Sequence, residues 1–114
     1  MQETVDRLEQ VVAAKGLKLF VVIDHSGEAA AHGLSLRDTK VVVFGSPVAG
    51  TPVMEAKPLA ALDLPLKVLV WDDGGQTQLS YVPPPELAAR YGLDDDLAAG
   101  LAGIEAVVQA TIAG

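Results

Sequence analysis

Residues 66–82, LKVLVWDDGGQTQLSYV, predict a β-hairpin and with it an antiparallel sheet. Leu66–Trp71 and Thr77–Val82 are rich in the β-branched and aromatic residues that strands prefer. Between them lies the turn Asp72–Gly75, whose two glycines tolerate the positive φ that tight hairpin turns demand. Pro83–Pro85 then ends the second strand, because proline donates no backbone hydrogen bond.

Two more strands are expected upstream of the hairpin. Leu17–Ile23 carries apolar residues on both alternating faces, which predicts a strand covered on both faces near the middle of the sheet. Lys40–Phe44 predicts another apolar strand. Before them, Gln2–Lys15 has apolar residues at helical spacing, and between them Ser26–Gly33 favours a short helix.

The remaining segments predict helices. The loop 45–52 is expected to lead into a helix with Thr51 as N-cap and Pro52 in its first position, bent or split by Pro58. A short helix should occupy Pro85–Tyr91. A final continuous helix is expected to follow from the four- and three-residue spacings of its apolar positions, which are Leu97, Leu101, Ile104, Val108 and Ile112.

Composition limits the classes of function. The chain has 114 residues, which suits one domain, and no cysteine, which excludes disulfides and a cysteine nucleophile and suits the cytoplasm. Its formal charge of -7 disfavours nucleic acid and anionic membrane surfaces as partners. The chain has no run of about 18 uninterrupted apolar residues, so the sequence predicts no membrane span. We therefore expect neither a nucleic-acid nor a membrane partner.

Three local strings, taken with the order of the elements, carry a family resemblance over nearly the whole chain. They are IDH at 23–25, FGSP at 44–47 with GTPVM at 50–54, and LDLPLK at 62–67 leading into VLVW at 68–71. The chain thereby resembles the domain-of-unknown-function family 302 (DUF302). The resemblance implies an α+β fold of two layers similar to the TATA-box-binding-protein class, with helices on one face of a curved antiparallel sheet of about four strands. It implies no established activity.

The chain departs from the family pattern in three places. Ser46 stands where Asn is usual, Asp38 stands where Pro is usual, and no strand precedes the first helix. A missing strand would leave an open sheet edge, and exposed edges invite pairing with another chain. The sequence therefore predicts a homodimer.

Asp24 and His25 are the first candidates for a site, since they follow a strand directly. A neutral imidazole could bind a metal or transfer a proton, with Asp24 orienting it, whereas the structural alternative is a surface histidine bonded to the backbone. His32 lies seven residues further on, and the pair without a third ligand is a weak metal signal. The sequence assigns no cofactor.

The loop 45–51 and the helix after it supply the other candidates, which are Ser46, Thr51, Met54 and Glu55. The glycine spacing is similar to a phosphate-binding loop, but the lysine of that motif is missing, so nucleotide hydrolysis is not supported. Backbone amides beside Thr51 could hold an anion, or the turn could simply cap a helix. Glu55 could share a crevice with His25 if the first two strands are neighbours.

Three functions remain open from the sequence. The favoured one is a non-enzymatic domain that binds a small ligand or a protein partner in a crevice between sheet and helices. The second is an enzyme with His25 as general acid or base, tuned by Glu55 or Asp24. The third is a structural homodimerisation module. The first two need the turn at 23–26 and the turn at 46–55 to lie on a common rim.

Overall fold

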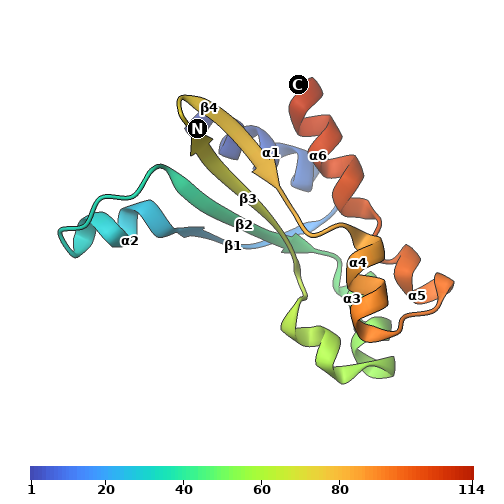
Figure 1. Ribbon diagram of the computed structural model, residues 1–114. Helices are drawn as coiled ribbons and strands as arrows, with labels where there is room; N and C mark the ends of the chain where they lie inside the picture. Colours follow the sequence, from blue (N-terminus) through green and yellow to red (C-terminus); the bar gives the residue numbers. More distant parts are fainter.

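Four strands form one antiparallel sheet in the order β1-β2-β3-β4 in the computed structural model, which describes residues 1–114 (Figure 1). They are β1 (Lys18–Asp24), β2 (Thr39–Gly45), β3 (Leu66–Asp73) and β4 (Gln76–Ser80). The β3–β4 hairpin is confirmed. Gly74 and Gly75 have φ of 61° and 95°, and Asp72 Oδ1 accepts a 2.8 Å hydrogen bond from the Gly75 amide.

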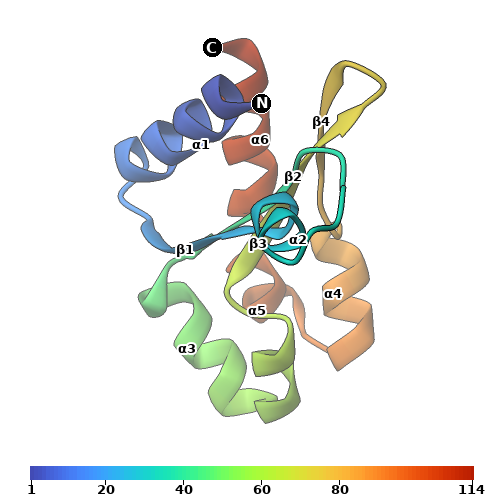
Figure 2. The same ribbon diagram turned by 90° about the vertical axis from the view of Figure 1, so that its left-hand side faces the viewer.

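Helices cover one side of this sheet, as the family resemblance implies. The α-helices are α1 (Gln2–Ala14), α2 (His25–Ala31), α3 (Pro47–Ala56), α4 (Pro84–Tyr91), α5 (Asp95–Ala99) and α6 (Gly103–Ala113), and η1 (Pro58–Leu62) is a 3₁₀ helix. Figure 2 shows α1 and α6 side by side against the sheet, and Figure 1 shows α3, η1, α4 and α5 gathered beyond the end where β2 finishes. The split between α3 and η1 falls at Pro58, as predicted.

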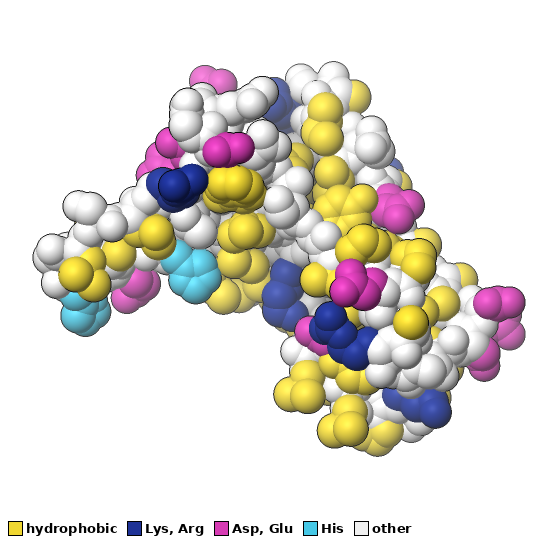
Figure 3. Space-filling view, in the orientation of Figure 1, with side chains coloured by type: hydrophobic (Ala, Val, Ile, Leu, Met, Phe, Trp, Pro, Cys, Tyr) yellow, Lys and Arg dark blue, Asp and Glu magenta, His cyan; other side chains and the backbone are white.

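The core lies between the inner face of the sheet and the helices. Phe44 pairs with Leu66 across β2 and β3, Val42 pairs with Val68, and all four side chains are buried. Helix α1 contributes the stripe that its periodicity predicts, namely Val5, Leu8 and Val12. On the outer face, hydrophobic side chains remain visible over the strands (Figure 3).

Strand β1 is an edge strand, so the expectation that it lies in the middle of the sheet was wrong. It pairs only with β2, and large apolar side chains along it are exposed, including 43% of Phe20 and 47% of Val21. A continuous apolar run is typical of a buried strand, but the place of a strand in a sheet depends on which segments pair with it.

Two helix predictions also need correction. Helix α3 begins at Pro47 with Ser46 as N-cap, whose Oγ accepts a hydrogen bond from the Ala49 amide, so Thr51 and Pro52 lie inside the helix. Ser46-Pro47 and Thr51-Pro52 are equivalent start signals, and the one adjoining the strand is used.

The final helix is broken at Gly100–Ala102 into α5 and α6. The whole segment Asp95–Ala113 is long and apolar enough to cross a membrane by length and composition alone, with a mean hydropathy of 1.3. In this fold its buried residues, Leu101, Ile104, Val107 and Val108, belong to the core.

Candidate functional site

A pocket of about 320 Å³ opens at the end of the sheet where β2 passes into α3. Its walls come from Gly45 and the first turns of α3, from Leu64–Leu66 at the start of β3, and from the junction of α5 and α6. Phe20 on β1 closes one side. No charged side chain lines it, whereas two more open hollows elsewhere are lined by charged residues such as Asp38 and Glu105. This apolar pocket is therefore the candidate functional site of the chain.

Three of the predicted site residues come together here. Ser46, Thr51 and Met54 all line the pocket, and Ser46 caps α3 with its oxygen while its hydroxyl proton remains able to donate. Glu55 is exposed on the same helix and does not line the pocket.

Asp24 and His25 lie at the opposite end of the sheet, so the expected common rim is wrong for a single chain. Because β1 and β2 are antiparallel neighbours, Asp24 pairs with Lys40 at the start of β2, while Ser46 follows the end of β2. The seven residues of β1 separate the two ends by about 20 Å. The pairing of His25 with Glu55 therefore has no geometric basis within one molecule. Histidine side chains, cyan in Figure 3, are seen only toward the α2 end.

Asp24 has a local structural task. Its Oδ1 accepts hydrogen bonds from the Gly27 amide and the Ser26 hydroxyl, both at 2.9 Å, and so caps α2. The hydrogen bond from the Gly27 amide is the main cause of a lowered pKa at Asp24, and the hydrogen bond from the Ser26 hydroxyl adds to it. His32 Nδ1 lies 3.0 Å from the carbonyl oxygen of Glu28 one turn earlier in α2. No group of three potential metal ligands is assembled in the structure.

The glycines of the pocket were not predicted as site residues. Gly45, Gly50 and Gly100 line the pocket, and none has the positive φ that requires glycine. A Cβ on Gly50 would meet nothing closer than Met54 Cε at 3.9 Å, so the missing side chain leaves space in the pocket. At Gly100 a Cβ would lie 3.2 Å from the Ala49 carbonyl oxygen, so this glycine permits close packing of α3 on the α5–α6 junction. Of these three glycines only Gly100 gave a signal in the sequence, because it interrupts a predicted helix, whereas Gly45 and Gly50 fell in the predicted loop 45–52.

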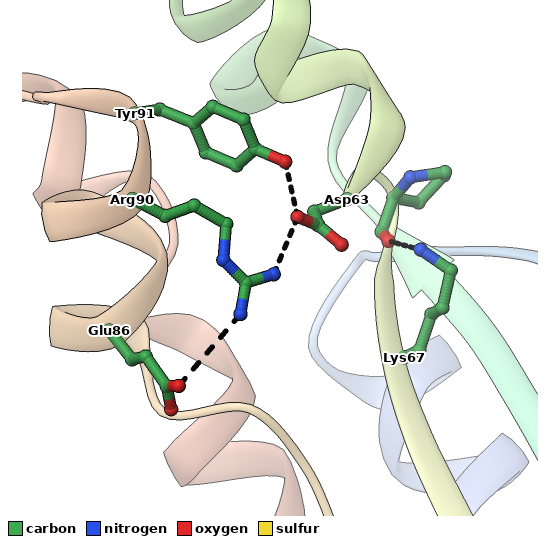
Figure 4. Close-up of polar contacts among 6 residues, drawn as sticks. Asp63, Lys67, Glu86, Arg90 and Tyr91 are labelled. Atoms are coloured by element: carbon green, nitrogen blue, oxygen red, sulfur yellow. Dashed lines mark hydrogen bonds and ion pairs between the residues drawn. The ribbon is translucent and has the colours of Figure 1, made fainter.

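A polar cluster fixes one wall of the pocket (Figure 4). The Tyr91 hydroxyl donates to Asp63, and Arg90 Nη1 lies 2.9 Å from the same carboxylate. Arg90 also approaches Glu86 at 3.8 Å, and Lys67 donates to the Pro65 carbonyl. Because Asp63 directly precedes Leu64 and Pro65, its contacts with α4 hold these lining residues in place.

The cluster shifts the pKa of its members. The hydrogen bond from Tyr91, with help from Arg90, lowers the pKa of Asp63, and the same bond raises the pKa of Tyr91. A carboxylate with a lowered folded pKa stabilises the fold above its unfolded pKa and loses that contribution as pH falls through the folded value.

We expect Asp63→Asn to lower the stability at neutral pH by about 1 kcal/mol, given that the ion pair is exposed and screened. The difference from the wild type should shrink as pH falls below about 4, because Asp63 takes up a proton first in the unfolded chain and, at lower pH, in the folded protein. Urea unfolding at several pH values measures this. Asp73→Asn, at an exposed position in the hairpin, is the control and should change little at any pH. A constant difference across the pH range would contradict the assignment.

The fold and pocket define a class, a two-layer α+β domain with an apolar pocket at one end of its sheet. The family model described as "Domain of unknown function DUF302" matches residues 1–111, and the chain belongs to this family. The crystal structure of uncharacterized conserved protein DUF302 from Bacillus stearothermophilus has a TM-score of 0.82 with 23% identity, covering 99% of this chain and 88% of that one. That likeness shows the fold.

Curated relatives are longer proteins. "Fluoride-specific ion channel FluC 1" of Brucella suis biovar 1 (strain 1330) is 37% identical over 99 residues, which is 84% of this chain and 39% of the relative. The protein of the same name from Brucella abortus biovar 1 (strain 9-941) is also 37% identical, with 37% of its length matched. The chain thus spans about two fifths of these relatives.

Proposed function

We propose that this chain is a non-enzymatic binding domain that takes a small molecule with an uncharged, largely apolar body into the pocket beside α3. The observation that carries the proposal is a pocket of about 320 Å³ without a charged lining residue, formed where two of the family strings meet. Its volume falls at the lower end of the range of about 300–1,000 Å³ typical of small-molecule sites.

The chemistry of the lining indicates what such a ligand would offer. Phe20, Met54, Leu64 and Leu101 supply apolar contact, and methionine adapts readily to differently shaped ligands. The hydroxyls of Ser46 and Thr51 can donate to a carbonyl or hydroxyl group of the ligand. A fully charged molecule would lose its hydration without a counter-charge in the wall.

The alternative of an enzyme using His25 has less support. His25 lies outside this pocket, and Asp24 is occupied in capping α2. Ion transport is also outside the proposal, because the matched segment makes up only about two fifths of the channel relatives. The cysteine-free sequence supports a reducing compartment such as the cytoplasm for this binding domain.

Nile red, an uncharged dye that fluoresces in apolar surroundings, tests the proposal. We expect the wild type to bind it and Met54→Asp to lower the affinity by about tenfold or more, because a short carboxylate in the wall cannot reach water as a long side chain can. Val48→Asp is the matched control, since Val48 is 86% exposed on the same helix and does not line the pocket. Equal binding by both variants, or none by the wild type, would remove the proposal.

A further inference from the structure

The outer edge of β1 has the features of a pairing strand. β1 has a neighbour on one side only, and Leu19, Phe20, Val21 and Ile23 are between 37% and 47% exposed along it. No charge and no proline interrupts the strand between Lys18 and Asp24. Soluble proteins normally protect such an edge with inward charges, prolines or a covering segment, because an exposed apolar edge pairs with other chains.

The charges at the two ends of β1 select the partner and its direction. Lys18 stands at the first position and Asp24 at the last. A second copy running antiparallel would place the Lys18 end of each strand beside the Asp24 end of the other, whereas a parallel copy would bring like charges together. Asp24 uses Oδ1 to cap α2, so its second carboxylate oxygen remains free for a lysine.

We infer that two copies of this chain pair antiparallel along β1 and join their sheets into one. The register between β1 and β2 shifts at Phe20, so a partner strand that spans Lys18–Asp24 has to accommodate one extra residue there. Val21 is the midpoint between Lys18 and Asp24, so the two-fold axis of the pair would pass near it.

This pairing would complete the pocket, an inference that rests on the proposed function. Phe20 forms one side of the pocket and is 43% exposed on the free edge. In an antiparallel pair, the end of β1 that carries Asp24 and His25 lies beside Lys18–Phe20 of the other copy. His25 of the partner subunit would then stand at the open side of the pocket, where a single chain provides no charged or titratable lining residue. The two turns that one chain keeps apart would meet across two chains.

Light scattering and cross-linking test the interface. We expect a mass of about twice 11.8 kDa, and a shift toward the monomer for Val21→Lys and for Lys18→Glu. Lys57→Glu, an exposed position on another segment, is the control for the change in charge. Because the chain has no cysteine, Val21→Cys introduces a single thiol and should form a disulfide-linked dimer on mild oxidation. Leu59→Cys, 71% exposed on η1, should not.

Nile red binding tests the shared site. His25→Ala should lower the affinity of the dimer for the dye at unchanged mass, and should have no effect in the Val21→Lys monomer. A wild type that stays monomeric at its solubility limit, or a Val21→Cys variant that cross-links no faster than Leu59→Cys, would overturn the inference. In that case a loss of dye binding in Met54→Asp would still support the pocket. Conversely, if the dimer cross-links but Met54→Asp binds the dye as well as the wild type does, the proposed interface would be supported and the proposed pocket contradicted.

Discussion

Phe44→Ala is expected to lower the free energy of unfolding by about 3–5 kcal/mol, the largest stability effect that we predict for a single substitution. The side chain is fully buried in β2 and pairs with Leu66 on β3, in the middle of the core. Its removal would lose apolar burial and leave a cavity that the neighbouring strands cannot close. Domains of this kind are stable by only about 5–15 kcal/mol, so much of the margin would be lost.

Urea unfolding followed by circular dichroism measures this change. Val48→Ala is the control, because Val48 is 86% exposed on α3, and its midpoint should stay close to that of the wild type. If Phe44→Ala changed the free energy of unfolding only slightly, Phe44 would not lie in the core and the assigned sheet register would be wrong.

Gly50→Leu is expected to lower the affinity for Nile red by about tenfold or more, equivalent to about 1.4 kcal/mol, without harming the fold. A Cβ at this position has room, with Met54 Cε as the nearest atom at 3.9 Å, and the leucine side chain would extend into the pocket. Because Gly50 lies within α3 with no positive φ, leucine should also remove the helix penalty of glycine, worth up to about 1 kcal/mol.

Binding and stability should therefore change in opposite senses. Thermal unfolding should show Gly50→Leu as stable as the wild type or more so, while dye fluorescence falls. Val48→Leu, exposed on the same helix, should leave both unchanged. If Gly50→Leu bound the dye as well as the wild type, the ligand would have to lie elsewhere, and the glycine would need a different explanation.

The sequence predicts the elements of this fold better than their arrangement. The two glycines after Asp73 and the helical spacing of Val5, Leu8 and Val12 are local signals, and both predictions were confirmed. The edge position of β1 and the break between α5 and α6 depend on contacts with distant segments. The start signals at Ser46-Pro47 and Thr51-Pro52 are equal in the sequence, and only the fold shows that the helix begins at Pro47.

The candidate site shows the same limit. Ser46, Thr51 and Met54 could be named from the loop and its helix, because all three are close in sequence. Phe20, Leu66 and Leu101 reach the pocket only through the pairing of β1, β2 and β3 and the packing of the C-terminal segments. The first two strands are neighbours, as the expected rim required, but they are antiparallel, and antiparallel neighbours send their following turns to opposite ends of the sheet.

Helices α1 and α6 pack together, and both views show the first and last residues close to one another on the side away from α3 (Figures 1 and 2). Any polypeptide joined to either terminus would therefore leave from that side and would not obstruct α3 or its surroundings. A domain with this layout can be carried as a module within a longer protein while its far end stays accessible. The curated relatives, of which only 37–39% is matched, are proteins in which such a module would be tethered.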